Sequence, residues 1–478
     1  MLLIAPGLST PAVAWGLAGI HVLLAGMVTV DVLLKKSDVR GAIGWIAASW
    51  FSPIFGSLTY YLFGINRVTR RASRFEILGD AQVSLPEANC LSTLNANIAL
   101  LSSSTAQVSG SPLTDGNRME MFQGGDAAYP AMLAAIAGAR HCIALASYVF
   151  RNDAAGRAFS DALIAAHRRG VVVRVLLDSV GIGYFFPAIL YRLRAAGVRA
   201  DRFLHTWMPW RMPFVNMRNH RKLLIVDGGV AFMGGMNVGA ENSRNLGAGT
   251  YIEDIHFCCH GPAVRLIMDA FARDWSFTTN EALDQPHWWP ALEKTGPVFA
   301  RGLRSGPDAD IYKLEMVLGA ALTLARKHIR IVTPYFLPDQ RLQFAIAQAC
   351  QRGVRVDIVI PEHCNYVFMD WAMRGHLRFF NHIPANIYLT PLPFDHSKLA
   401  TVDGEWSLVG SSNWDARSLR LNFEYNLECY DTDLAEKLDA IIDAKIARAR
   451  KLLPQELASG PVLLRLRDAA ARLFMPYL

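Results

Sequence analysis

The chain has 478 residues, 52% of them hydrophobic, and a mean hydropathy of +0.19. This composition argues against an ordinary soluble enzyme and favours membrane attachment, in a chain long enough for two domains and an appendage. A formal net charge of +7 predicts an anionic partner, either nucleic acid or an anionic bilayer. Charge alone does not choose between the two.

Two apolar stretches near the beginning predict membrane helices. Residues 11–34 are interrupted only by His21 and Asp31, and residues 41–64 are apolar apart from small polar residues. Each stretch is long enough to cross a hydrocarbon core of about 30 Å. A signal peptide is the alternative for the first stretch, but no positive region precedes it and a second apolar stretch follows closely. We expect residues 1–74 to anchor the chain with two hydrophobic helices, one of which can be re-entrant.

Basic residues on both sides of the second stretch bear on its orientation, because positive charge favours the cytoplasmic side. Three lie between the stretches and a richer group of four follows: Lys35, Lys36, Arg40, Arg67, Arg70, Arg71 and Arg74. The richer group favours a catalytic region that faces the cytoplasm. Residues 75–120 are predicted to be a juxtamembrane linker.

The rest of the chain contains one pattern twice. Residues 169–177 are echoed by residues 352–360, and each half reads as strand, helix, strand and then a strand that carries a histidine motif. This order predicts an α/β unit with a buried sheet. The period is far longer than that of solenoid repeats, so it indicates a domain duplication. We assign repeat 1 to residues 121–285 and repeat 2, with a Pro- and Gly-rich linker, to residues 286–455.

The histidine motif has the spacing H-x-K-x-x-x-x-D in both halves. Each copy continues at the same interval to an asparagine, so the repeated set is His220, Lys222, Asp227 and Asn237, then His396, Lys398, Asp403 and Asn413. A lone histidine on a strand is usually structural, but two copies with matching extensions are not expected by chance. The repeat predicts one active site shared by two halves.

Phosphodiester chemistry explains these residue types. One histidine can attack phosphorus through one ring nitrogen if an acceptor fixes the proton on the other. A facing histidine can protonate the leaving group and then deprotonate the acceptor alcohol. Each lysine shares a strand face with its histidine, so both ammonium groups can neutralise one anion, and the asparagines add neutral donors. A metal is unnecessary in this scheme, and no cofactor is expected.

The aspartates of the motif invite a different interpretation. Asp227 and Asp403 each follow an apolar strand and precede a glycine, Gly228 or Gly404. Asp at such a position often caps a turn. We therefore expect both to be structural supports of the site.

The paired motifs resemble the phospholipase D superfamily over roughly residues 121–450, and the strings at 218–222 and 410–426 resemble bacterial cardiolipin synthases. The resemblance places the His, Lys and Asp of both motifs in the catalytic set. It also implies two duplicated α/β/α domains with mixed sheets packed face to face around one shared active site, preceded by two N-terminal membrane helices.

In this superfamily a carboxylate on a later strand orients each histidine. By position, Asp254 is expected to serve His220 and Glu424 to serve His396. Two neighbouring glutamates are alternatives: Glu253 and Glu428.

The first copy also has Gly235 where the second has Ser411. That asymmetry suggests that the histidines do different jobs, without indicating which one attacks.

The resemblance implies phosphatidyl transfer between two phosphatidylglycerol molecules, which gives cardiolipin and glycerol through a phosphatidyl-histidine intermediate. The alternatives are a phospholipase D-type hydrolase and a synthase that uses phosphatidylethanolamine or another alcohol; a membrane-tethered nuclease and a non-catalytic scaffold are more distant. The expected partners are the bilayer and anionic phospholipids (phosphatidylglycerol and cardiolipin), with no nucleic acid. We expect a multi-pass protein of the bacterial inner membrane, and the oligomeric state is left open.

Three further segments carry weaker expectations. The loop 205–214 mixes aromatic, Met and Arg residues and is expected to dip into the membrane interface or line an acyl groove, with base stacking or a buried loop as alternatives. The tail 456–478 is expected to form a basic amphipathic interfacial helix, or else a helix packed on the domain through the same apolar face. The seven cysteines show no metal-binding spacing and suit reduced, buried thiols.

Overall fold

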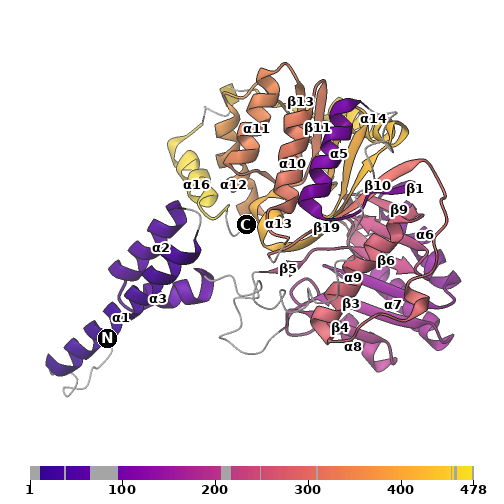
Figure 1. The fold of residues 1–478 in the computed structure, drawn as a ribbon, viewed down its shortest axis with the longest axis horizontal. Coiled ribbons are helices and arrows are strands. Elements are labelled where there is room, and N and C mark those ends of the chain that lie inside the picture. The colour runs from indigo at the N-terminus through magenta and orange to yellow at the C-terminus, as the bar shows by residue number, and fades with distance from the viewer. Residues whose placement is uncertain are drawn as a thin grey trace. The chain divides into compact units, whose positions relative to one another are not determined.

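The computed structural model describes residues 11–36, 39–64, 95–205, 217–247, 249–307, 310–453, 455–456 and 460–475. The chain divides into a small N-terminal helical unit and a large α/β unit (Figure 1). Several expectations fall outside the described residues: the basic group at 67–74, nearly all of the loop 205–214, and Cys90.

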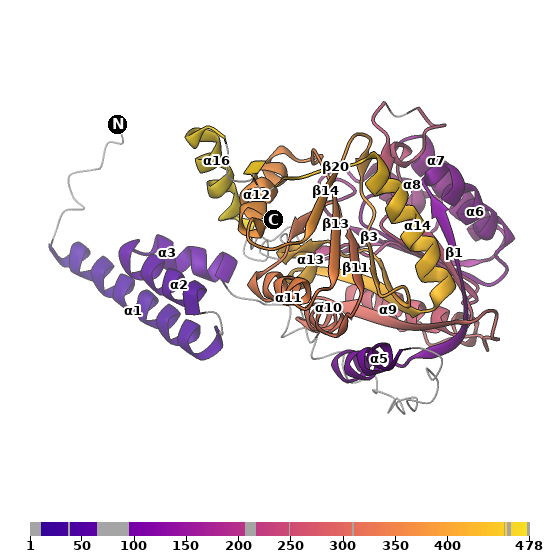
Figure 2. The same ribbon diagram turned by 90° about the horizontal axis from the view of Figure 1, so that it is seen from above.

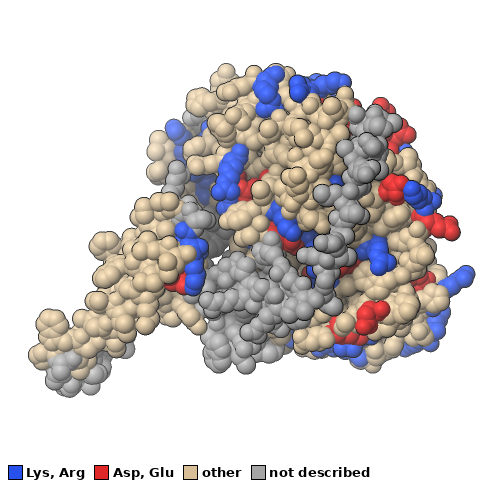
Figure 3. Space-filling view, viewed as in Figure 1, with Lys and Arg blue, Asp and Glu red and all other residues tan. Residues whose placement is uncertain are grey.

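The N-terminal unit contains one long apolar helix followed by a broken second segment. Its elements are α1 (Pro11–Lys35), α2 (Val39–Phe51), α3 (Phe55–Thr59) and the π-helix η1 (Tyr60–Gly64). Among the described residues one helix, Val13–Lys35, is long and apolar enough to cross a membrane. Figure 3 shows that most of the visible surface of this unit carries no charge, apart from a blue group with some red at one end.

The second apolar stretch differs from the expected spanning helix. It ends as α2 at Phe51, and Pro53 follows, where a missing N–H and a fixed φ interrupt helical hydrogen bonding. The stretch then resumes as the short α3 and η1. Asp31, the one acidic residue of α1, accepts a hydrogen bond from the Tyr60 hydroxyl at 2.7 Å, which ties the two segments together.

Repeat 1 is an α/β/α unit around a mixed sheet. Along the sheet the order is β1 (Thr114–Gln123), β9 (Ile255–His260), β7 (Val230–Gly234), β6 (Leu223–Val226), β2 (Cys142–Ser147), β3 (Val172–Asp178) and β4 (Arg199–Phe203). Only β2, β3 and β4 pair in parallel. The helices of one core are α6 (Gly125–Gly138), α7 (Ala154–Arg168) and α8 (Ala188–Ala195), and α9 (Ala263–Thr279) contacts the sheet separately.

Alternation along β3 explains the two helical layers. Val173, Val175 and Leu177 belong to the core that includes α6, α7 and α8, whereas Leu176, also buried, lies outside that core. Successive strand side chains point to opposite faces, so both faces of this strand are covered. A parallel core buried on both faces is typical of α/β units.

Repeat 2 repeats the arrangement. Its sheet order is β10 (Val298–Ser305), β19 (Asn422–Tyr430), β17 (Trp406–Gly410), β16 (Leu399–Val402), β11 (His328–Val332), β13 (Arg355–Pro361), β14 (Asn386–Thr390) and β20 (Arg450–Lys451). Its helices are α10 (Lys313–Leu324), α11 (Gln340–Gln351), α12 (Val367–Leu377), α14 (Thr432–Arg448) and α16 (Val462–Arg472).

Short elements complete the two repeats. They are β5 (Arg218–Asn219), η4 (Ala240–Asn242), β8 (Ile252–Glu253), η5 (Pro286–Trp288), β12 (Phe336–Leu337), η6 (Arg378–Phe380), β15 (Phe394–Asp395), β18 (Trp414–Asp415) and α13 (Ala416–Arg420).

The two repeats join along β1 and β10, which pair antiparallel and link both half-sheets into one path (Figures 1 and 2). The duplicated mixed α/β fold is therefore confirmed, but the sheets meet edge to edge here, where face-to-face packing was expected. The predicted linker 75–120 is also corrected, because β1 begins at Thr114 and α5 (Ala96–Ser109) packs on α10. Ile98 and Leu101 of α5 are buried in the core of repeat 2.

Two exchanged strand pairs bring the histidine segments together. From repeat 1, β5 pairs in parallel with the start of β19 in repeat 2. From repeat 2, β15 pairs in parallel with β8 in repeat 1. Because β5 and β15 directly precede the two motif histidines, each histidine enters the site against the other repeat.

Candidate active site

His220 is fixed by three contacts with repeat 2. Its backbone N–H donates to the Phe423 carbonyl at 2.9 Å. Its Nδ1 lies 3.0 Å from Oε2 of Glu424 and 3.1 Å from the Ser411 carbonyl. With Nδ1 held by acceptors, Nε2 is the nitrogen left for chemistry.

His396 is fixed in the same way by repeat 1. Its backbone N–H donates to the Glu253 carbonyl at 2.7 Å, and its Nδ1 lies 2.8 Å from Oδ2 of Asp254. The other Asp254 oxygen accepts the Ile255 N–H at 2.8 Å. Both histidine side chains are largely buried, 9% exposed for His220 and 13% for His396.

The pairing of histidines with carboxylates is opposite to the one expected from sequence. Glu424 serves His220 and Asp254 serves His396, so each carboxylate crosses to the other repeat. The expectation was wrong because it matched each histidine with the later strand of its own repeat. The exchanged pairs β5–β19 and β8–β15 reverse that assignment.

The two alternative glutamates are engaged elsewhere. Glu428 is fully buried and pairs with Arg301 at 2.5 Å. The Glu253 side chain forms ion pairs with Arg448 and, at 3.7 Å, with Arg244. Neither glutamate orients a catalytic ring in this structure, although the Glu253 backbone holds His396.

The Gly235 and Ser411 asymmetry has a direct structural cause. The Ser411 hydroxyl donates to Oε2 of Glu424, the oxygen that faces His220. At the matching place in repeat 1, a Cβ on Gly235 would lie 2.5 Å from Oδ1 of Asp254. Asp254 therefore occupies the space that a serine side chain would need, and its carboxylate has one hydroxyl donor fewer than Glu424.

The two motif lysines face one anion-binding space. Lys222 and Lys398 are 3% and 5% exposed, and each donates to the backbone carbonyl of its own motif histidine. Burial, and then the charge of Lys398, lowers the pKa of Lys222 to about 7, although Glu424 opposes the shift. Burial also lowers the pKa of Lys398 to about 8. An anion between the ammonium groups would relieve both the burial cost and their repulsion.

Burial lowers the pKa of both motif histidines. Burial lowers the pKa of His220 to about 4, a shift that Glu424 only partly offsets. Burial and the charge of Lys398 lower the pKa of His396 to about 4. A neutral imidazole is the form in which a histidine can act as a nucleophile.

Glu424 stays ionised beside His220. Burial raises its pKa, but its interactions with His220, Lys222 and Ser411 outweigh that effect and lower it. Its second oxygen accepts the Asn422 amide at 3.1 Å. This carboxylate is therefore matched to stabilising a positive charge on the His220 ring.

The two asparagines occupy unequal surroundings. The Asn237 amide oxygen accepts the Val149 N–H at 3.1 Å. Asn413 is 5% exposed, and its amide oxygen has no hydrogen-bond partner among the described residues. Their role as phosphate donors stays a prediction.

Asp227 and Asp403 act on backbone, at the far end of each motif strand. The Asp227 carboxylate accepts the N–H groups of Arg140, His141 and Cys142 at 2.7–2.9 Å. The Asp403 carboxylate accepts the N–H groups of Arg326, Lys327 and His328 at 2.7–2.9 Å. Each Asp lies seven positions after its histidine, which is at most about 23 Å at roughly 3.3 Å per residue of extended chain. These bonds fit structural supports and place both aspartates outside the reacting centre.

Sequence reasoning missed two tyrosines that contact the histidines. The Tyr148 ring meets His220 edge-on at 5.0 Å and lies 5.2 Å from the Lys222 ammonium. The Tyr335 ring meets His396 at 6.5 Å. Each tyrosine closely follows an inner strand of its repeat, β2 or β11, and a phenylalanine follows each tyrosine within two residues, which was the available signal in the sequence.

Sequence reasoning also missed a buried ion pair behind each histidine segment. Arg221 pairs with Asp274 of α9 at 2.6 Å, and Asn219 donates to the same carboxylate at 2.8 Å. In repeat 2 the carboxylate is Asp395, which pairs with Lys445 of α14 at 2.6 Å. The charges are exchanged between motif segment and helix, so a search for identical residues does not find the correspondence.

Metal-binding clusters of His, Cys, Asp and Glu do not occur among the described residues. The six cysteines within that part of the chain are free thiols. Burial raises the pKa of Cys142 and Cys258 to about 12, which keeps both as unreactive thiols.

The chain is similar in sequence to known proteins along most of its length. A sequence family described as "Cardiolipin synthase, PLD-like domain" matches residues 132–275 and 318–446, and one described as "Phospholipase_D-nuclease N-terminal" matches residues 23–64. The major cardiolipin synthase ClsA of Bacillus subtilis is 29% identical, over 96% of this chain and 97% of its own. The cardiolipin synthase of Geobacillus kaustophilus is 30% identical, over 94% and 91%.

Solved structures add a likeness of fold. The phosphatidylserine synthase of Haemophilus influenzae aligns with a TM-score of 0.63 at 16% identity, over 79% of this chain and 100% of that one. It supports the duplicated architecture alone. The cardiolipin synthase family model alone matches more than half of the residues, and a relative is 30% identical over nearly the whole chain, so the chain belongs to the phospholipase D-like cardiolipin synthase family.

Proposed function

We propose that the protein transfers a phosphatidyl group from one phosphatidylglycerol to another, giving cardiolipin and glycerol. The observation that carries the proposal is the crossed pair of histidines, each with a carboxylate on Nδ1, beside two buried lysines. A phosphodiester is exchanged for a phosphodiester, so no nucleotide is needed. Relatives that are named as cardiolipin synthases match nearly the whole length of the chain.

Two displacements at phosphorus make up the reaction. Nε2 of one histidine attacks phosphorus, the bond to the glycerol oxygen breaks, and Nε2–H of the other histidine protonates that oxygen. The product is a phosphatidyl-histidine. A hydroxyl of the second lipid then gives its proton to the same general base and attacks phosphorus, which breaks the P–N bond and restores both rings.

Charged side chains lie beside the groups whose charge changes during the reaction. Lys222 and Lys398 neutralise the equatorial oxygens, which gain charge in each transition state. Glu424 and Asp254 stabilise the rings as they become cationic. The general acid needs a second ring proton, and the charge of the bound phosphodiester raises the pKa of that ring so that it takes the proton up from water.

A second observation favours an anionic acceptor. Burial, and then repulsion by Arg218, lowers the pKa of Arg417. Burial raises the pKa of Tyr148, and the charges of both guanidinium groups oppose that increase. The Tyr148 ring contacts His220. Two cations close together beside the reacting centre suit a substrate that carries a phosphate of its own, as phosphatidylglycerol does.

We also propose a membrane setting for the reaction. The apolar α1 would anchor the chain, with the broken α2–α3 segment re-entrant or spanning, and the active site on the cytoplasmic side of a bacterial inner membrane. Keeping the site at a lipid surface raises the local concentration of lipid hydroxyls and limits water, which would otherwise hydrolyse the intermediate.

The test supplies labelled phosphatidylglycerol to the purified full chain. Glycerol release with cardiolipin as the main product is expected, and His220→Ala and His396→Ala are each expected to lower turnover by about 10³-fold or more. Mass spectrometry of trapped enzyme would place the phosphatidyl group on one of the two histidines. Phosphatidic acid as the main product would favour a hydrolase, and substantial turnover by either variant would refute the shared site.

A further inference from the structure

The C-terminal helix α16 attaches to the protein through a polar and small-residue face. Asp468 and Ala471 are 4% and 2% exposed and lie against α12. Asp468 pairs with Arg467 at 2.7 Å and with Arg378 at 3.7 Å. Gly375 of α12 permits the close approach, since a Cβ there would lie 2.4 Å from the Asp468 carbonyl.

The leucine-rich face of α16 is left uncovered as a consequence. Leu463 is 79% exposed, Leu466 60% and Leu473 72%. Of the two expectations for this tail, packing through the apolar face is therefore wrong for the described residues. Exposed apolar groups gathered on one helix mark a contact surface for another molecule or a membrane.

Exposed apolar side chains continue onto α12. Tyr366 and Val367 at its beginning are 65% and 63% exposed, and Phe368 contacts Phe474 ring to ring at 5.7 Å. We call the exposed apolar side chains on these two helices and on the residues next to them the α12–α16 surface: Tyr366, Val367, Phe368, Phe379, Val462, Leu463, Leu464, Leu466, Leu473 and Phe474.

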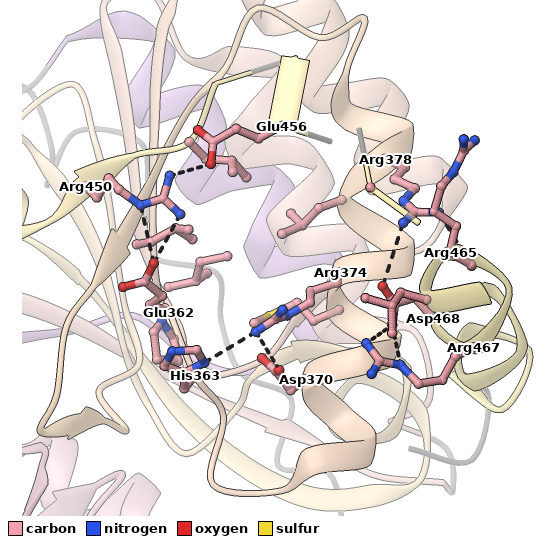
Figure 4. Close-up of a pocket in the computed structure, with 18 of the residues that line it drawn as sticks. Glu362, His363, Asp370, Arg374, Arg378, Arg450, Glu456, Arg465, Arg467 and Asp468 are labelled. Atoms are coloured by element: carbon pink, nitrogen blue, oxygen red, sulfur yellow. Dashed lines mark hydrogen bonds and ion pairs between the residues drawn. The ribbon is translucent and has the colours of Figure 1, made fainter. Parts of the chain in front are cut away.

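Basic charge accompanies the α12–α16 surface. Residues 366–380 and 460–475 contain five arginines and two aspartates, a net charge of +3. A cavity of about 330 Å³ adjoins this surface, and some of the arginines that line it form ion pairs with other lining residues. Arg450 pairs with Glu362 and Glu456, and Arg374 pairs with Asp370 (Figure 4). No ion pair involving Arg465 or Arg472 occurs among the described residues.

The same surface adjoins the reacting centre. Ala471 of α16 and Met369 of α12 share a small core with Tyr335 and Phe394. The rings of Tyr335 and Phe394 both contact His396, at 6.5 and 6.1 Å. One layer of side chains thus separates the α12–α16 surface from the active site.

We propose that the α12–α16 surface docks onto an anionic bilayer and sets the active site at its lipid source. Apolar side chains with arginines on one exposed helix are the pattern of an interfacial helix, in which leucines enter the acyl boundary and arginines meet phosphate groups. The anionic charge of the bilayer complements the net positive charge of this surface. The inference rests on the proposed function, because its purpose is to present a lipid substrate.

The experiment compares bilayer and dispersed substrates in the full chain. Leu463→Asp with Leu466→Asp places two charges on exposed positions, so thermal stability is expected to stay unchanged. Cardiolipin formation is measured on phosphatidylglycerol vesicles and on short-chain phosphatidylglycerol dispersed as monomers. The vesicle rate divided by the monomer rate is expected to fall about tenfold, because docking depends on buried apolar area.

The matched control is Met316→Asp, a similarly exposed apolar residue (57%) on α10, which is expected to leave this ratio unchanged. Hydrogen exchange of the full chain in nanodiscs gives an independent measurement: α16 amides are expected to be protected by phosphatidylglycerol more than by phosphatidylcholine. An unchanged ratio, or a rate that depends on self-association lost in the double variant, would overturn the docking proposal. Absence of cardiolipin from both substrates would instead overturn the proposed function.

Discussion

The two histidine centres have the same plan but different supports. His220 faces a glutamate that also receives a serine hydroxyl, whereas His396 faces an aspartate packed against a glycine. The longer carboxylate of Glu424 leaves room for Ser411, and the shorter Asp254 fills the equivalent space. Duplication therefore preserved the geometry at Nδ1 while the strength of the acceptor diverged.

This difference teaches where two equivalent histidines can acquire different roles. Both rings carry a pKa near 4 from burial, so the rings themselves do not distinguish attack from proton transfer. The carboxylates do, since an acceptor with fewer donors stabilises a cationic ring differently. Four changes test the comparison, in order of decreasing effect on activity.

The crossed carboxylates have the largest expected effect. Glu424→Gln and Asp254→Asn are each expected to lower kcat by about 10²–10⁴-fold, because the amide no longer stabilises a cationic ring or fixes its tautomer. Spectra of ¹⁵N-labelled histidine, assigned with the two His→Ala variants, check the crossing. Glu424→Gln should move the His220 signals and leave those of His396. Movement confined to His396 would contradict the crossed arrangement.

Substitution of either motif lysine by alanine is expected to lower the rate of turnover by about 10²–10³-fold. Their lowered pKa values of about 7 and 8 mean that the ammonium forms exist at lower pH and are lost as pH rises through those values. In the free enzyme kcat/KM should therefore fall on the alkaline side. Lys222→Arg, which remains charged, should move that fall to higher pH. An unchanged alkaline limb would show that Lys222 does not control it.

The Gly235 and Ser411 positions sharpen the comparison further. Ser411→Ala removes a donor to an ionised carboxylate, so a loss of about tenfold to a hundredfold is expected. The pKa of Glu424 should rise, which moves the acid limb of activity upward. Gly235→Ala should displace Asp254 and impair His396 instead.

Gly229→Ala serves as the control for Gly235→Ala, because a Cβ there meets only the Asp227 carbonyl, at 3.8 Å. Steady-state kinetics across pH measure all three variants. If Ser411→Ala changed the kinetics no more than Gly229→Ala does, the proposal that Ser411 supports Glu424 would be contradicted.

Asp227→Asn and Asp403→Asn should have the smallest effect on activity and a clear one on stability. Each carboxylate accepts three backbone N–H groups, so each change is expected to cost about 1–3 kcal/mol in the free energy of unfolding. Activity per folded molecule should stay within about threefold of the unmodified protein, since these bonds lie far from phosphorus. Unfolding monitored by circular dichroism, with rates corrected for the folded fraction, separates the two effects. A large kinetic loss in a stably folded variant would give the aspartates a chemical role.

Much of the fold was accessible from sequence because it depends on local patterning. Apolar strands, amphipathic helices and their order predicted the duplicated α/β architecture and the long apolar helix. Residues 95–120 were misassigned because β1 and α5 have weak patterns, and their burial comes from distant partners, β9, β10 and α10. The second apolar stretch was read as continuous although Pro53 divides it.

Some residues of the candidate site could likewise be identified from local sequence patterns, and others only from the tertiary structure. The motif spacing identified His220, Lys222, His396 and Lys398, because residues two apart on a strand share a face regardless of the rest of the fold. Tyr148 entered only with the structure, since its contact with His220 joins strands far apart in the chain.

The sequence by itself determined the residue types of the candidate site and the number of their copies, since a repeated spacing constrains residue type and strand face. Only the tertiary structure decided which carboxylate serves which histidine. That choice depends on the exchanged pairs β5–β19 and β8–β15, which are contacts between distant segments. It also decided that the leucines of α16 stay exposed, because Asp468 and Ala471, rather than the apolar face, found partners on α12. Local pattern fixes the periodicity of a helix, and packing chooses the face that is buried.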